Sequence, residues 1–111
     1  MSATLGNALG MHARSTSCLV ALIKAFESKV YSWDVRYSKN RVCLNYEDGV
    51  SPLISALLHF ASINVGDVIC FEITGKDEDQ ACEAIKQLIL DGFHEGLEIK
   101  PDIEVSIIDN I

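Results

Sequence analysis

The chain has 111 residues, which is enough for one small domain with a single core. Hydrophobic residues make up 49% and charged residues 23%, proportions typical of a folded domain and not of a disordered chain. The net charge of -7 repels the phosphates of nucleic acids and anionic lipids, so neither is expected as a direct partner.

The sequence carries no membrane, export or metal-binding signal. The longest stretch without Asp, Glu, Lys or Arg, residues 49–66, contains proline, histidine, asparagine and serines and does not predict a membrane span. No basic start followed by an apolar run opens the chain, so we expect a cytoplasmic protein. The cysteines stand singly and predict buried reduced thiols rather than a zinc site or disulfides. They are Cys18, Cys43, Cys70 and Cys82.

The first half of the chain predicts a helix and then a β-hairpin. Apolar side chains recur at helical spacing over residues 15–28. They are Leu19, Leu22, Ile23 and Phe26. Residues 31–37 and 41–46 alternate apolar with polar side chains, and residues 38–40 join them, so two strands are expected, each with one apolar face. On the first strand that face carries Tyr31, Trp33, Val35 and Tyr37.

The second half predicts a helix, a central strand and another helix. Ser51 is a candidate N-cap and Pro52 the first helical residue. That helix has one face formed by Leu53, Leu57, Phe60 and Ala61. Residues 67–74 are rich in Val, Ile and Phe, which favours a central strand. Asp77 and Gln80 have capping-box spacing, so the acidic cluster that follows Gly75 indicates a helix start rather than a metal site. The helix carries Ala81, Ile85, Leu88 and Ile89 and ends near Gly92.

The remaining segment, beyond Gly96, predicts a late strand, because Ile103, Val105 and Ile107 stand at alternating positions. With the short N-terminal element, the three helices and a mostly antiparallel sheet predict an α+β sandwich with the helices on one face.

The segment NALGMHAR places His12 immediately before the first helix. A histidine ring nitrogen can attack phosphorus, and the free N–H groups and positive dipole end of a helix favour a phosphoryl group beside it. Arg14 adds a permanent charge whose forked donors match phosphoryl oxygens, and Ser15 and Thr16 can donate hydrogen bonds or cap the helix. The alternative is an ordinary loop histidine beside a capped helix.

These residues make the sequence resemble the HPr family of phosphocarrier proteins of the sugar phosphotransferase system. The resemblance spans about residues 4–92, and FEITGKDEDQACEAIKQLI resembles the family's last strand and helix. It implies an HPr-like open-faced sandwich with a four-stranded, mostly antiparallel sheet and three helices on one face. The HPr-like domain would occupy residues 1–96, and a C-terminal extension, residues 97–111, would pack on that domain or add a strand.

The resemblance also implies the chemistry. His12 would be phosphorylated on its pros nitrogen and Arg14 would stabilise the phosphate, supported by Ser15 and Thr16. Phosphorylated enzyme I would donate the phosphoryl group and enzyme IIA-type proteins would accept it, so the chain would be a stoichiometric carrier rather than a true enzyme, with no cofactor and no metal. Apolar residues near His12 would be either a docking patch for these partners or core. They are Met11, Ala13, Leu57 and Leu58. Contact with membrane transport components would come only through partners.

Three departures from the family pattern leave an alternative open. Ser15 stands where the family has Pro, so the first helical turn must be held by hydrogen bonds. Leu53 stands at the family's regulatory serine, and Ser51, two positions earlier, is a plain N-cap or a regulatory phosphorylation site. The first strand is short, and the apolar tail, residues 99–108, either extends a sheet edge of its own chain or pairs with another copy.

The alternative reading is a regulatory protein-binding module of the same fold without efficient phosphoryl transfer. A metal-binding protein using His12, His59 and His94 has little support, because these residues share no ligand spacing.

Overall fold

A computed structural model of the chain describes residues 1–7, 9–37 and 40–105. Its elements in chain order are β1 (Ser2–Thr4), α1 (Ala13–Ile23), β2 (Lys29–Asp34), the 3-10 helix η1 (Val35–Tyr37), β3 (Val42–Cys43), α2 (Leu53–Phe60), β4 (Val68–Thr74), α3 (Glu78–Leu90) and β5 (Ile103–Glu104).

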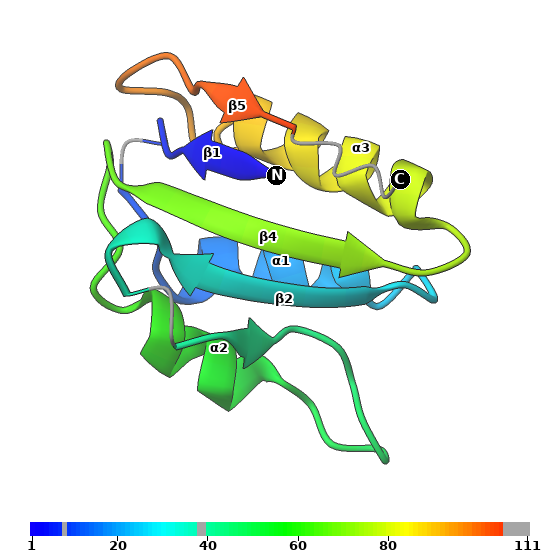
Figure 1. The fold of residues 1–111 in the computed structure, drawn as a ribbon. Helices are drawn as coiled ribbons and strands as arrows, with labels where there is room; N and C mark the ends of the chain where they lie inside the picture. Colours follow the sequence, from blue (N-terminus) through cyan, green and yellow to red (C-terminus); the bar gives the residue numbers. More distant parts are fainter. Residues whose placement is uncertain (8, 38–39, 106–111) are drawn as a thin grey trace.

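The strands form one sheet in the order β3-β2-β4-β1-β5, and every neighbouring pair is antiparallel. Figure 1 shows α1 and α3 behind this sheet, with α2 beside them near β3. The other face of the sheet carries no helix in that view. The predicted α+β open-faced sandwich is therefore confirmed, with a fifth strand added by the C-terminal segment.

The core lies between the sheet and the helices. Leu19 and Ile23 of α1, Phe60 of α2 and Ile85 of α3 are fully buried there, and β4 contributes its alternating Ile69 and Phe71. Figure 1 shows β4 in the middle of the sheet, in agreement with the expectation of a central strand.

The face of β2 that packs on the core is the opposite of the one that its apolar pattern indicates. Ser32 and Asp34 are buried, whereas Tyr31 and Trp33 are only half-buried. Ser32 stands opposite Phe71 and Asp34 opposite Ile69, and directly opposed residues of paired strands share a face. The pairing with the buried side of β4 therefore decides the orientation. Val35 and Tyr37, expected on the strand, belong to η1.

Both aromatic side chains of β2 lie on the open face of the sheet. Trp33 is covered there by Arg41, whose guanidinium lies 4.2 Å from the centre of the indole ring. Arg41 also forms an ion pair of 3.0 Å with Glu72 of β4. The aromatic face is thus covered by a long basic side chain instead of a helix.

α3 begins after its predicted N-cap residue, Asp77, but the end of α1 and the predicted cap of α3 differ from expectation. α1 ends at Ile23, before the predicted boundary at residue 28, and Asp77 forms no side-chain cap on α3. The Asp77 carboxylate instead accepts hydrogen bonds of 2.9 Å from the backbone N–H groups of Glu27 and Ser28. The predicted capping box with Gln80 is wrong, because a contact between distant segments uses the carboxylate that it needs.

The C-terminal segment runs back along β1. The Asp102 carbonyl accepts a hydrogen bond of 2.8 Å from Thr4 N–H, and the Gly6 carbonyl accepts one of 2.6 Å from Glu98 N–H. β5 then pairs with Ser2 and Ala3. The C-terminal segment therefore extends a sheet edge of its own chain, which is one of the two arrangements expected from the sequence. Ile107 lies outside the described residues.

The four cysteines are free and half-buried, so they are less buried than expected. Within the described ranges, no group of three or more potential ligands could hold a metal ion. No helix in that part of the chain is long and apolar enough to cross a membrane.

Candidate functional site

His12 is the N-cap residue of α1. A turn leads into it, in which Asn7 accepts a hydrogen bond of 3.0 Å from Gly10 N–H. Gly10 has a φ of +66°, and a Cβ there would lie only 3.0 Å from the Cα of Asn64, so both backbone conformation and space require glycine. Met11 then anchors the turn, since its side chain is buried and its N–H bonds to the Ile63 carbonyl at 3.1 Å.

One edge of the His12 ring faces the helix N-terminus. Nδ1 accepts a hydrogen bond of 3.3 Å from the backbone N–H of Arg14. The Ser15 hydroxyl completes a capping box by accepting a bond of 3.0 Å from His12 N–H. The first turn of α1 contains no acidic residue, so no carboxylate of the helix itself competes for the free N–H groups at its positive end. Nδ1, which is the pros nitrogen, therefore lies at the position where a helix stabilises an anion.

The other edge of the ring contacts a residue that the sequence analysis did not find. Nε2 of His12 lies 2.5 Å from Oε2 of Glu95, in the loop after α3. The Glu95 side chain is only 5% exposed, whereas that of His12 is 33% exposed. Asn7 donates a hydrogen bond of 3.3 Å to the second carboxylate oxygen. Because Nδ1 accepts and Glu95 is an acceptor, the arrangement corresponds to a ring that carries its proton on Nε2.

No local sequence pattern predicts that Glu95 contacts His12. The two residues are 83 positions apart, and Glu95 belongs to no periodic segment. Its loop follows Gly92, where α3 ends, and two non-glycine residues of that loop, Phe93 and His94, have φ of +55° and +65°. Such conformations cluster at functional sites, but they become visible only in the structure.

The predicted supporting residues lie in different surroundings. Arg14 is exposed, and within the described parts of the chain its guanidinium has no acidic partner. Ser15 is buried and bonded to the backbone around His12. Thr16 is also buried, and its hydroxyl oxygen has no hydrogen-bond partner among the described residues, so it makes no hydrogen bond to the His12 ring.

The predicted docking residues divide between surface and core. Leu58 is 75% exposed, Ala13 is exposed and Leu57 is half-buried. Met11 is 4% exposed and packs in the core, so its assignment to a docking surface is corrected: anchoring of the loop takes its side chain inward. Ser51 is exposed, and its hydroxyl accepts a hydrogen bond of 3.2 Å from Leu53 N–H. The predicted helix start is off by one residue, because Pro52 is the N-cap residue and Leu53 the first residue of α2.

The two other histidines serve elsewhere. His94 pairs with Asp91 at 2.5 Å, at the surface. His59 lies half-buried in a hollow between α2 and β3 that also contains Asp34, and burial lowers the pKa of its ring.

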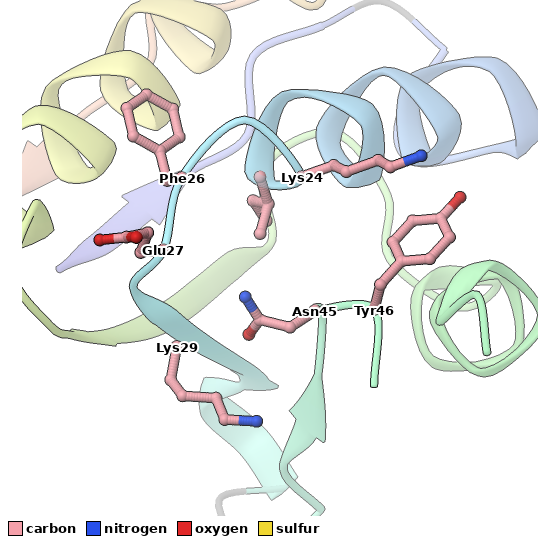
Figure 2. A pocket seen from close by; sticks show the side chains of 7 residues that line it. Lys24, Phe26, Glu27, Lys29, Asn45 and Tyr46 are labelled. Atoms are coloured by element: carbon pink, nitrogen blue, oxygen red, sulfur yellow. The ribbon is translucent and has the colours of Figure 1, made fainter. Parts of the chain in front are cut away.

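A second hollow, of about 180 Å³, lies at the far end of α1, between the α1–β2 loop and the segment that carries Asn45 and Tyr46 (Figure 2). Both lysines of this hollow already have partners: Lys24 lies 4.5 Å from the centre of the Tyr46 ring, and Lys29 forms an ion pair with Glu47. The 11 residues of α1, at about 1.5 Å each, place this hollow about 16 Å from the His12 turn. It is not part of the His12 site.

Comparisons with known proteins show which family the chain belongs to. The family model described as "PTS HPr component phosphorylation site" matches residues 1–91 of the chain. The chain belongs to the HPr family. HPr proteins are the phosphocarriers of the phosphotransferase system that supplies sugar transport, and the predicted membership is confirmed. A search of curated protein sequences finds no match.

Three solved structures share the HPr fold. HPr-C-His from Thermoanaerobacter tengcongensis is 22% identical and superposes with a TM-score of 0.71, over 87% of this chain and 97% of that one. The histidine-containing phosphocarrier protein of Mycoplasma is 27% identical, with a TM-score of 0.60, over 82% of this chain and 91% of that one. Phosphocarrier protein HPr from Bacillus anthracis is 18% identical, with a TM-score of 0.63, over 80% and 93%.

Proposed function

We propose that this HPr protein carries a phosphoryl group on Nδ1 of His12, which it accepts from phosphorylated enzyme I and passes to an enzyme IIA-type protein. The observation that carries the proposal is the position of the ring: its pros nitrogen faces the N-terminal N–H groups of α1, and one third of the side chain is exposed. A partner can therefore reach the nitrogen from solvent.

The chemistry follows from the two edges of the ring. With its proton on Nε2, the ring has a lone pair on Nδ1, which forms the new N–P bond while the bond between phosphorus and the donor breaks. Backbone N–H groups of the first turn of α1 and the exposed guanidinium of Arg14 then donate to the phosphoryl oxygens. Onward transfer is the reverse: the Nδ1–P bond breaks and its electron pair returns to the ring.

Exposed apolar side chains on α2 and in the turn before α1 suit the docking of partner proteins. Ile54 and Leu58 are one helical turn apart on α2, and each is more than 70% exposed. Leu9, 70% exposed, lies in the turn that bonds to Ile63 just after α2. We expect enzyme I and enzyme IIA-type proteins to cover these three side chains, with Ala13, while they reach His12. Ser51 is not modified in this proposal; its hydroxyl accepts the Leu53 N–H just before α2.

Incubation with phosphoenolpyruvate and enzyme I tests the proposal. The protein should gain one phosphoryl group in an acid-labile, base-stable form, and His12→Ala should abolish the gain. His94→Asn is the matched control, because it removes an exposed histidine from a left-handed backbone position that Asn tolerates. Phosphorylation that persists in His12→Ala would refute the site, and a phosphorylated protein that fails to pass its group to any enzyme IIA would refute the carrier role.

A further inference from the structure

Glu95 contacts the proposed phosphoryl-accepting residue more closely than any other side chain that the structure describes, with 2.5 Å between its Oε2 and Nε2 of His12. We propose that Glu95 is a positioning residue that keeps the proton on Nε2, so that the ring leaves as neutral imidazole when its phosphoryl group is transferred. This inference rests on the proposed function of His12 and adds a second residue to it.

The surroundings of Glu95 indicate a placed side chain and not an accidental surface contact. Its side chain is 5% exposed, and burial of a carboxylate is costly unless hydrogen bonds satisfy it. Here Asn7 donates to one oxygen and His12 Nε2 to the other. Asn7 is itself buried and also donates to the Gly10 carbonyl at 2.5 Å, so it ties the carboxylate to the turn that leads into His12.

The loop that carries Glu95 has a strained backbone just before this residue. Phe93 and His94 both adopt left-handed conformations, which cost about 1 kcal/mol or more per non-glycine residue. Phe93 is 1% exposed and packs in the core, which anchors the loop, and Glu95 N–H bonds to the Gly92 carbonyl at 3.0 Å. The loop is thereby held in the conformation that directs Glu95 toward His12.

The effect on transfer follows from the electron balance. In the phosphorylated ring, Nδ1 bears phosphorus and Nε2 bears a proton, so the ring is cationic. An acceptor atom attacks phosphorus, the Nδ1–P bond breaks, and its electron pair neutralises the ring. If Nε2 had lost its proton first, the leaving group would be the far more basic imidazolate. A carboxylate hydrogen-bonded to Nε2–H favours the protonated ring and thus the better leaving group.

Among the described residues, the charged side chain that contacts the ring directly is Glu95, which reaches Nε2 from the loop after α3. On the Nδ1 side the contact is the backbone N–H of Arg14, at the start of α1. Asn7, from the segment after β1, is neutral. Glu95 is therefore the group that distinguishes Nε2 from Nδ1.

The first experiment observes the unphosphorylated full-length protein by NMR, so its result does not depend on any partner. The Nε2 proton of His12 should give a strongly downfield, slowly exchanging resonance, as short charge-assisted hydrogen bonds do, and Glu95→Gln should lose it. Glu98→Gln is the matched control, since it removes an exposed carboxylate from the same segment. The same signal in Glu95→Gln would overturn the inference.

The second experiment measures loss of the phosphoryl group to water after chemical phosphorylation with phosphoramidate, which needs no enzyme I. At the same pH, phosphorylated Glu95→Gln should hydrolyse about tenfold more slowly than the parent protein, which corresponds to about 1.4 kcal/mol in the barrier. Glu98→Gln should hydrolyse at the parental rate, and Glu95→Asp should recover part of the loss. An unchanged rate in Glu95→Gln would overturn the role in transfer. Failure of enzyme I to phosphorylate the parent protein would count against the proposed function and not against this contact.

Discussion

At the scale of single residues, Ser15 explains how the first turn of α1 is held without the proline that the family has at this place. Its side chain is fully buried, and its hydroxyl bonds to both the N–H and the carbonyl of His12, at 3.0 and 3.2 Å. These bonds fix the N-cap residue relative to the helix. The expectation that hydrogen bonds replace the rigidity of proline is thus met by a capping box, and Ser15 supports His12 through the backbone and not through the ring.

Ser15→Ala should lower the free energy of unfolding by about 1 kcal/mol, the usual cost of losing a helix cap, because it leaves His12 N–H without its partner. Urea denaturation followed by circular dichroism measures the change. Ser17→Ala is the control: Ser17 is exposed on the same helix, where alanine is the better helix former, so stability should stay equal or rise slightly. Equal stability of Ser15→Ala and the parent would show that the capping box contributes nothing.

At the scale of elements, β2 shows how pairing overrides an apolar pattern. Its buried face contains Ser32 and Asp34, and Asp34 is acceptable there because Arg36, in η1, donates to it from its backbone N–H at 2.9 Å and from Nη2 at 2.7 Å. The hydrogen bond from Arg36 holds the pKa of Asp34 below its usual value. A buried charge at the end of the strand is thereby satisfied by the element that follows it.

Asp34→Asn should lower the free energy of unfolding by about 1 kcal/mol at neutral pH, since the partner Arg36 is half-exposed. Because the folded-state pKa of Asp34 lies below the unfolded one, its contribution is present above about pH 4 and is lost as the pH falls through the folded-state pKa. The difference in urea midpoint between parent and variant should therefore shrink on acidification.

Asp48→Asn provides the comparison for this titration, because it removes an exposed carboxylate from a loop position with a φ of +51° that Asn tolerates. A midpoint difference for Asp34→Asn that stays constant from neutral to strongly acidic pH would contradict the assignment.

At the scale of the whole molecule, the C-terminal segment both completes the sheet and lies next to the site. It pairs with β1 through β5, and residues Asn7 and Leu97 form a further bridge close to Glu95. The outermost strands, β3 and β5, have two residues each, and short edges give another chain little to pair with. The segment covers the edge of β1 within one chain.

The close approach of this segment depends on Gly6, where a Cβ would collide with the carbonyl oxygen of Ile99 and crowd the ring of Pro101. Gly6→Ala should lower the free energy of unfolding by about 1–3 kcal/mol, as overpacking does, and should speed proteolysis within residues 97–105. Gly49→Asn is the control, because no atom lies within 4 Å of a Cβ there and Asn tolerates its φ of +76°. Unchanged proteolysis in Gly6→Ala would show that the segment does not depend on this contact.

By itself the sequence determined the local features. Apolar spacing predicted the helices, and the Val, Ile and Phe content predicted the central strand. The segment NALGMHAR placed His12 at a helix start. Only the tertiary structure decided the features that join distant segments. The buried face of β2 depends on its register with β4, Asp77 bonds to Ser28 and not to its own helix, and Glu95 reaches His12 across 83 residues. Periodicity depends only on the spacing of side chains within one segment. A hydrogen bond between two loops depends on how the whole chain folds to bring them together.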